Sequence, residues 1–354
     1  MFVEDETKTI LSNNCTVTQK IDKQNNCINI VCNENKEEHT YNYNVINDCL
    51  YPLFCDKNRW EYLNEKIQYN KSDIIIATYP KSGTTWLEQI ILLMKHGIKS
   101  QEQLKPSIRN NYDFKHKIGK IHIEGSIEQP NNDLYESEEM KYISMESFNN
   151  IPFRLIKTHA PYPLFIAKDK VFENKNKIVL IFRNPLDTAV SSYFHYNSLR
   201  EFHKKNTDPN NAYKSISFHN WSLLWLRGLV SFGSWFEWTN HWYNVYLQNT
   251  SHIHFIKYEE LKTNTMFELK RLNDFLETNL TDNELSNIVE LTRFEKMKSD
   301  AKKYVVDDIN SDVHFRKGVI GDWSNYFETS TVELYKNKLK KHDELYSLYK
   351  DIFV

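Results

Sequence analysis

The sequence predicts an α/β protein: a single domain with a central parallel sheet flanked by helices and a P-loop-like phosphate cradle. Three observations predict this class. Short apolar segments recur along the 354 residues, and segments with helical patterning follow them. A loop that contains Lys81 and Gly83 joins the first apolar segment to a helix, and polar or charged residues follow every apolar segment. Strands that alternate with helices build parallel sheets covered on both faces.

Four strands are expected in this sheet. They cover residues 73–79, 153–159, 177–183 and 252–258. Apolar residues at helical spacing predict helices that follow the strands, at residues 84–96, 186–200 and 261–278. The aromatic-rich span 221–243 has a spacing near three and four residues, which predicts helices packed in the core.

The first 50 residues are predicted to be an N-terminal appendage to a main domain at 51–354. A small hairpin is expected there, with strands at 28–32 and 39–45 around a turn at 33–35. All five cysteines lie in the first 55 residues. Their odd number, without a CxxC pair or a nearby set of His ligands, indicates reduced thiols rather than disulfides or a metal site.

The composition argues against several functions. Lys plus Arg (45) nearly balances Asp plus Glu (47), which disfavours nucleic-acid binding and a polybasic membrane contact. The acidic first residues lack the features of a signal peptide, and the longest apolar runs are too short to cross a bilayer. A soluble cytoplasmic protein is expected.

Residues 79–86, YPKSGTTW, have the character of an anion cradle. Backbone N–H groups at a helix N-terminus lack partners and carry partial positive charge. Gly83 lets the backbone approach a bound anion, and Lys81 adds a full charge. The ATP and GTP cradle, GxxxxGK[ST], has its Lys after the last Gly, whereas Lys81 precedes Gly83. The loop therefore predicts an anion site of a different kind.

Cations follow the other strands as well. Lys157 and His159 end the second strand, Arg183 ends the third, and Lys257 lies at the end of the fourth. Ligands of open parallel sheets bind outside the carboxyl ends of the strands. The sequence therefore predicts a site for a highly anionic ligand at this edge of the sheet.

Six ordered segments resemble motifs of the cytosolic sulfotransferases, over roughly residues 50–330. They are 79–86, 157–159, 183–185 with Ser191, 258–260, 294–297, and 316–318 with 321–323. The resemblance implies transfer of the sulfuryl group of 3′-phosphoadenosine-5′-phosphosulfate (PAPS) to a hydroxyl or amine. The implied acceptor is a small, apolar molecule such as a phenol, steroid or alcohol, and no metal is expected.

The resemblance also implies the residues that act in this reaction. The catalytic residues would be His159 as general base, with Lys81, Lys157 and Ser191, and the substrate-binding residues would be Lys157, Thr158 and His159. A positioned histidine titrates near neutral pH and suits proton abstraction from an acceptor hydroxyl. The implied cofactor-binding residues are Lys81, Ser82, Gly83, Thr84, Thr85, Trp86, Arg183, Ser191, Tyr258, Thr292, Phe294, Met297, Arg316, Lys317 and Gly318.

Some features depart from the family pattern. Arg293 and Ala160 stand where the family usually has a small residue and Leu, respectively. The dimer-forming stretch of the family is not reproduced after residues 321–323, so the oligomeric state stays open. The insert around 99–150 is polar and has little periodicity, and long connections of this kind are often lids. The resemblance implies that it is a lid over the acceptor.

The residues alone leave two alternatives to a sulfotransferase open. A P-loop kinase would need an acidic metal ligand after a neighbouring strand and a Lys after the last Gly of the loop. A catalytically silent nucleotide-binding module would be marked by loss of Lys81 or His159, and both are present. A sulfated product that eliminates is not excluded by the sequence.

Overall fold

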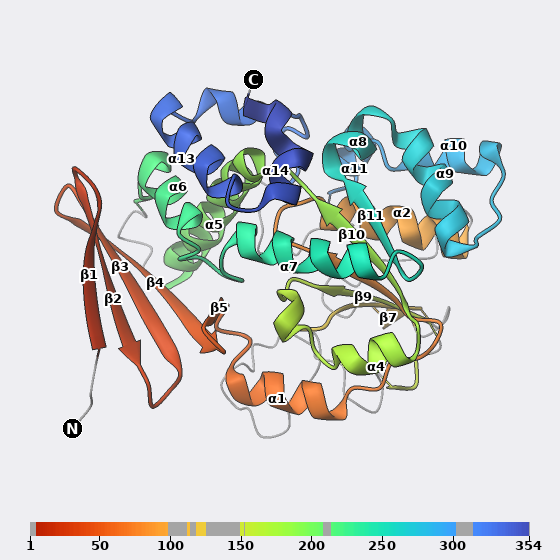
Figure 1. Ribbon diagram of the computed structural model, residues 1–354, viewed down its shortest axis with the longest axis horizontal. Coiled ribbons are helices and arrows are strands. Elements are labelled where there is room, and N and C mark those ends of the chain that lie inside the picture. Colours follow the sequence, from red (N-terminus) through yellow and green to blue (C-terminus); the bar gives the residue numbers. More distant parts are fainter. Residues whose placement is uncertain are drawn as a thin grey trace.

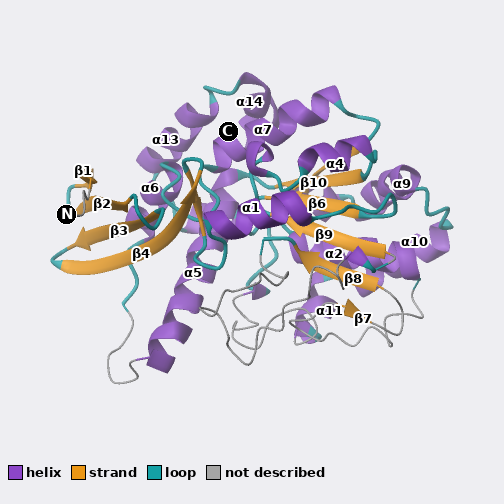
Figure 2. Ribbon diagram, turned by 90° about the horizontal axis from the view of Figure 1, so that it is seen from below, coloured by secondary structure: helices purple, strands orange, loops and turns teal. Residues whose placement is uncertain are grey.

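The computed structural model describes residues 5–97, 112–113, 118–124, 149–151, 153–207, 214–301 and 314–353 (Figure 1). These residues build a six-stranded sheet with helices on both of its faces and a five-stranded antiparallel sheet made by the N-terminal residues (Figures 1 and 2).

The six-stranded sheet has the order β11-β10-β6-β9-β8-β7. Its strands are β6 (Ile74–Thr78), β7 (Tyr112–Asp113), β8 (Ile118–His122), β9 (Phe153–Thr158), β10 (Lys177–Phe182) and β11 (Ile253–Lys257). All neighbours are parallel except β7 and β8. Ala77 of β6 pairs with Thr158 of β9 and with Leu180 of β10, so these strands end at one edge. The predicted parallel sheet and its four strands are confirmed.

Side chains of the central strand β6 point alternately to the two faces, as the pleat of a strand requires. Ile74 and Ile76 pack in a cluster with α2 (Thr84–His96), α9 (Thr265–Leu276) and α10 (Asp282–Leu291). Ile75 and Ala77 belong to a second cluster, on the opposite face, with α5 (Pro185–Thr207) and α7 (Trp235–Gln248). All five residues of β6 are buried, as expected for a central parallel strand.

The predicted helices are present, with one break. The helix expected at 84–96 is α2, and the one expected at 186–200 lies within α5. The segment 261–278 forms two helices, α8 (Tyr258–Thr263) and α9, because Asn264 leaves the helical conformation at φ −137° and ψ 53°. The remaining elements are α1 (Lys57–Lys66), η3 (Tyr162–Leu164), α4 (Lys168–Glu173), α6 (Phe218–Leu226), α11 (Phe294–Ser299), η5 (Asp322–Asn325), α13 (Thr329–Leu339), α14 (Asp343–Tyr349) and η6 (Lys350–Phe353).

The aromatic-rich span forms core, as predicted. Trp221 and Trp225 on α6, with Trp235, Trp238 and Trp242 on α7, are each fully buried in the cluster on the α7 face of the sheet. Each large aromatic side chain removes much apolar area from water, so this span contributes strongly to stability.

The N-terminal residues form a five-stranded meander rather than only one hairpin. Its strands are β1 (Asp5–Ser12), β2 (Cys15–Asp22), β3 (Cys27–Glu34), β4 (Glu37–Ile46) and β5 (Cys49–Tyr51). The expected hairpin is β3 and β4, with its turn at Asn35 and Lys36. Both turn residues have positive φ, 51° and 71°, as a type I′ turn requires. All five cysteines are free thiols.

The N-terminal sheet shares its core with the main domain. Val17 and Ile30 are fully buried in the same cluster as the α6 and α7 tryptophans, and Tyr41 lies against Trp221, with ring centroids 6.2 Å apart. The buried carboxylate of Glu34 accepts hydrogen bonds from the backbone N–H of Ser217, at the start of α6, and from the side chain of Asn220. These contacts join residues 5–51 to the helical face of the large sheet.

The insert around 99–150 contributes strands β7 and β8, which its polar sequence did not indicate. The other residues of the predicted lid, apart from 118–124 and 149–150, lie outside the described residues. Within the described parts of the chain, no helix combines the length and the apolar character that crossing a membrane demands.

Because the N-terminal sheet shares its core with the main domain, a cavity in this sheet should lower the stability of the whole fold. We expect Ile30→Ala to lower the free energy of unfolding by about 2–5 kcal/mol, in one transition measured by chemical denaturation. Ile10→Ala removes a side chain that is 74% exposed and should change it by less than about 0.5 kcal/mol. A separate minor transition in Ile30→Ala would show instead that the sheet unfolds independently.

Candidate active site

The loop between β6 and α2 forms the cradle at the carboxyl edge of the sheet. Lys81 and Gly83 both have left-handed backbones, at φ 70° and 105°. A Cβ on Gly83 would lie 2.8 Å from the ring of Tyr258, so only glycine lets the loop lie this close to α8. No side chain caps the start of α2. Its first amides therefore remain available for an anion.

Lys81 carries the charge of this cradle. Burial is the main cause that lowers its pKa to about 7, and the neighbouring cations Arg183 and Lys157 lower it further. An arriving anion would reverse these effects and favour the protonated ammonium. The three cations therefore lie near enough to interact, as the strand-end pattern predicts.

Arg183 holds the cradle against a second loop. Its Nη1 donates to the carbonyl of Lys81 at 3.3 Å, and its Nη2 lies 3.5 Å from the carbonyl of Val319. The guanidinium lies over the ring of Tyr258, 4.5 Å from its centroid. Lys257 is not part of this group, because it pairs with Glu260 at 3.3 Å and lies over the Tyr349 ring.

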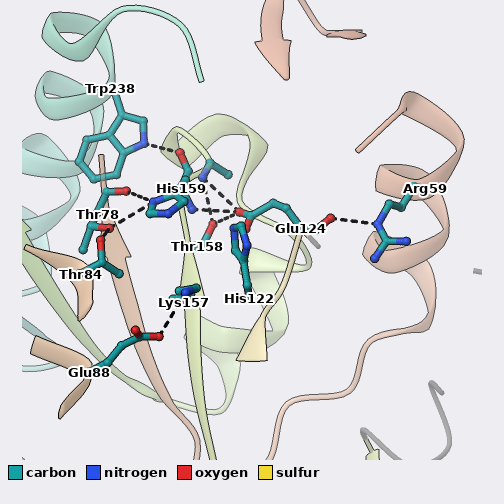
Figure 3. A network of polar contacts seen from close by, with 11 residues as sticks. Arg59, Thr78, Thr84, Glu88, His122, Glu124, Lys157, Thr158, His159 and Trp238 are labelled. Atoms are coloured by element: carbon teal, nitrogen blue, oxygen red, sulfur yellow. Dashed lines mark hydrogen bonds and ion pairs between the residues drawn. The ribbon is translucent and has the colours of Figure 1, made fainter. Parts of the chain in front are cut away.

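His159 follows β9 and is held at one ring nitrogen. Its Nδ1 lies 2.7 Å from the carbonyl oxygen of Thr78 (Figure 3). A carbonyl only accepts hydrogen bonds, so Nδ1 carries the proton and Nε2 keeps its lone pair. Burial chiefly lowers the pKa of His159 to about 3, and His122 adds to this effect. The imidazole is therefore neutral at physiological pH.

A buried carboxylate, Glu124, holds the chain around His159 (Figure 3). Its Oε1 accepts hydrogen bonds from the Thr158 hydroxyl and from the backbone N–H groups of His159 and Ala160. Its Oε2 lies 2.9 Å from Nε2 of His122. Burial alone raises the pKa of Glu124, but these partners outweigh burial and lower it to about 2. Glu124 is therefore an anion that fixes three consecutive residues.

Lys157 lies between this group and the helix α2. Its Nζ is 3.5 Å from Oε1 of Glu88, a fully buried carboxylate on α2 (Figure 3). The side chains of Thr78 and Thr84 meet at 2.7 Å and join the end of β6 to the start of α2. These contacts place Lys157 and His159 beside the cradle.

The loop after residue 314 brings two further cations to the site. Arg316 and Lys317 both bind Asp322, at 2.6 Å and 2.7 Å. Asp187 of α5 fixes this loop, because its carboxylate accepts hydrogen bonds from the backbone N–H groups of Gly321 and Trp323. Helix α5 begins with Pro185 at its first position and Asn184 as its cap, and Asn184 Oδ1 accepts from Asp187 N–H at 2.8 Å.

Aromatic side chains lie between the cradle and this loop. Trp86 and Tyr258 meet edge to face at 5.8 Å, and Met297 packs with Trp86 and Phe294. Gly318 lies against Phe294, where a Cβ would approach the ring to 2.3 Å. The hydroxyl of Thr292 donates to the carbonyl of Ile288 in its own helix. Together these residues form flat apolar surfaces beside the cations.

Comparisons with known proteins agree with this geometry. Residues 71–345 match the sulfotransferase domain family. The chain belongs to the sulfotransferase family. It is 30% identical to mouse sulfotransferase 1B1, over 80% of this chain and 86% of that protein, and 30% identical to rat sulfotransferase 1A1, over 74% and 81%. The crystal structure of mouse sulfotransferase SULT7A1 complexed with PAP is 28% identical, with a TM-score of 0.62, and covers 87% of this chain and 98% of that one.

Family membership confirms the expected class of enzyme: a PAPS-dependent sulfotransferase of α/β fold. The kinase alternative is not supported by these comparisons. In the structure, Arg183 and His159 follow β10 and β9, so no acidic residue comes directly after either strand. The chain also retains Lys81 and His159, the two residues whose loss would mark a silent module.

Most of the predicted site residues of this sulfotransferase come from the segments that meet at the carboxyl edge of the sheet. The cradle residues follow β6, Lys157 and Thr158 are the last two residues of β9, and His159 and Arg183 come directly after β9 and β10. The 314–321 loop is bound to α5. Ser191 lies on α5, partly buried. Arg293, a departure from the family pattern, pairs with Glu290 at 2.6 Å and is more than half exposed.

His122, the last residue of β8, and Glu124, two residues further on, were not among the predicted site residues. A signal for them existed, because Ile121 and Ile123 alternate with these polar residues in the manner of a strand. The strand is short and lies within a polar insert, so the alternation was not distinguished from its surroundings. Asp187, Glu88 and Asp322, which hold cations or loops of the site, were missed as well.

Glu124 should position His159 without touching the donor cradle. We expect Glu124→Ala to lower kcat about 10²-fold, since small displacements of a catalytic group have effects of this size. The affinity for the desulfated donor, measured by calorimetry, should change less than about threefold because the cradle amides keep their places. Glu61→Ala, at an exposed position of α1, serves as the control and should leave both values unchanged. An unchanged kcat in folded Glu124→Ala would contradict the positioning role.

Proposed function

We propose that this sulfotransferase moves the sulfuryl group of PAPS in line to the hydroxyl, or amine, of a small acceptor, with His159 as the general base. One observation carries the assignment: the Thr78 carbonyl fixes the proton of His159 on Nδ1, beside a cationic cradle. Nε2 of His159 therefore keeps a lone pair, which can take the proton from the hydroxyl of the acceptor. A positioned base of this kind contributes about 10²–10⁴ to the rate.

The donor would be held by groups already arranged around the site. We assign the phosphosulfate end to Lys81 and the amides of Ser82, Gly83, Thr84, Thr85 and Trp86. Four side chains and one glycine would hold the 3′-phosphate: Arg183, Ser191, Arg316, Lys317 and Gly318. Trp86, Tyr258, Thr292, Phe294 and Met297 would surround the adenine. Asp322 keeps Arg316 and Lys317 in place before the phosphate arrives, which reduces the cost of ordering them.

The residues of this site can account for both the transferred sulfuryl group and the transferred proton. The acceptor oxygen forms a bond to sulfur, while the bond from sulfur to the bridging oxygen of the donor breaks. Nε2 of His159 receives the acceptor proton. Protonated Lys81, aided by Lys157, stabilises the charge that develops on the leaving phosphate, which is preorganised electrostatic catalysis. Lys157 keeps its position through the buried carboxylate of Glu88.

The acceptor would lie against the aromatic residues near His159. Phe232 packs edge to face with the His159 ring at 5.4 Å, and Phe54 packs in the same way with His122 at 5.9 Å. Such walls suit a small molecule with a flat or apolar body. Lys157 and His159 would contact its reacting end, whereas Thr158, which is fully buried and donates to Glu124, would help to hold His159 in place. We place the enzyme in the cytoplasm, without nucleic acid or membrane as a partner.

The proposal is tested by His159→Ala with labelled PAPS and a panel of phenols, steroids, alcohols and amines. We expect kcat to fall about 10²–10⁴-fold, while calorimetry shows binding of the desulfated donor near the wild-type value. His219→Ala removes a histidine of α6 whose Nδ1 lies 3.8 Å from Oε2 of Glu328, and it should retain full activity. Wild-type turnover by His159→Ala would contradict the general-base assignment, and a wild-type enzyme that transfers label to no acceptor would contradict the proposed reaction.

A further inference from the structure

The loop that carries Arg316 and Lys317 is bound to two helices that begin at the carboxyl edge of the sheet. At its far end, the backbone N–H of Gly321 donates to the carboxylate of Asp187 on α5. At its near end, His314 contacts α2. These helices follow β10 and β6, which are neighbours in the sheet. The proposed reaction assigns no role to His314.

The imidazole of His314 binds the donor cradle directly. Its Nε2 lies 3.1 Å from the hydroxyl oxygen of Thr85, the second residue of α2, and the two residues are 229 positions apart in the sequence. A hydroxyl both donates and accepts, so this hydrogen bond forms with either tautomer of the ring. Both side chains are partly buried, which limits competition from water. The bond therefore fixes residue 314 against the start of α2.

The residues that follow His314 reach two other parts of the proposed donor site. Phe315 is buried, and its ring lies 6.2 Å from that of Phe294 in the adenine wall. Arg316 and Lys317, assigned to the 3′-phosphate, come next. Four consecutive residues thus connect the cradle, the adenine wall and the 3′-phosphate cations. The position of His314 sets how far these cations lie from the cradle.

Arg183 makes a second contact between the cradle and this loop. Its guanidinium donates to the carbonyl oxygens of Lys81, at 3.3 Å, and of Val319, at 3.5 Å. Both distances are long for hydrogen bonds, and Arg183 is itself assigned to the 3′-phosphate, so the ligand competes for these donors. Neither the imidazole of His314 nor the hydroxyl of Thr85 is assigned to the nucleotide. Their bond can therefore hold the loop both before and after the nucleotide binds.

We propose that His314 is a positioning residue, which holds the loop at the distance from the cradle that a nucleotide with both a 5′- and a 3′-phosphate requires. The inference rests on the proposed function, and it concerns the selection of the donor. A nucleotide with both phosphates contacts the cradle and the loop together, so it gains affinity from a loop that is already in place. A nucleotide without the 3′-phosphate gains nothing from the cations of the loop.

Calorimetric binding of 3′-phosphoadenosine-5′-phosphate and of adenosine 5′-phosphate tests this role. The ratio of their dissociation constants measures the contribution of the 3′-phosphate. We expect His314→Phe to lower this preference about three- to tenfold, the size of one hydrogen bond, and to change the affinity for adenosine 5′-phosphate less than about twofold. His314→Gln, whose amide can bond the Thr85 hydroxyl, should retain most of the preference. In turnover, His314→Phe should raise the KM for PAPS and leave kcat within about twofold.

Thr85→Val removes the same hydrogen bond from the other side. Any direct loss at the 5′-phosphate affects both nucleotides and cancels in the ratio. If His314 acts through Thr85, the double variant should show the preference of either single variant rather than the product of the two losses. If His314→Phe does not fold, Thr85→Val alone makes the comparison between the two nucleotides.

The control is His254→Phe. His254 is a buried histidine in the first half of β11, where its ring stacks on Phe275 at 5.1 Å, and its replacement should keep the wild-type preference. If His314→Phe leaves the preference unchanged, or weakens both nucleotides equally, the proposal is wrong. Multiplying losses in the double variant would also contradict it. A wild-type protein that binds both nucleotides equally tightly would instead contradict the proposed 3′-phosphate site, and the positioning role with it.

Discussion

The buried carboxylate of Glu124 is the contact on which the geometry of the active site depends. One oxygen accepts from the Thr158 hydroxyl and from two consecutive backbone amides, and the other faces His122. The carbonyl of Glu124 accepts in turn from Nε of Arg59 at 2.9 Å. Strand β8 is thus joined to the end of β9 and to α1. An anion held by so many donors has little freedom, and the residue that follows β9 shares this rigidity.

The same edge of the sheet concentrates positive charge that the protein only partly balances. Glu88 partners Lys157, and Asp322 partners Arg316 and Lys317, whereas burial and like charges weaken the hold of Lys81 on its proton. An anionic donor stabilises these cations, because its attraction for them offsets their mutual repulsion. The free energy of folding already holds the cations close together, so they are in place before the donor binds.

The central sheet and the anion-binding loop could be predicted from the sequence, whereas the residues that position the catalytic groups could not. The run Ile74-Ile75-Ile76-Ala77, followed by Lys81 and Gly83, identified the central strand and the cradle, because buried parallel strands and anion-binding helix starts leave local patterns. Glu124 and His122 depend on the pairing of β8 with β9, a contact between segments that are separated by an unpatterned insert. The same holds for the N-terminal residues. The hairpin could be predicted because it is a local feature, but the core that the N-terminal sheet shares with α6 depends on long-range packing.

In this structure His159 is a neutral imidazole with its proton on Nδ1, fixed there by the Thr78 carbonyl. Nitrogen-15 NMR of histidine side chains measures the protonation of each ring nitrogen, and comparison with His159→Gln assigns the signal. We expect a neutral ring with the proton on Nδ1 from pH 8 down to pH 5, because burial lowers the pKa of His159 to about 3. A proton on Nε2, or an imidazolium at pH 7, would contradict it.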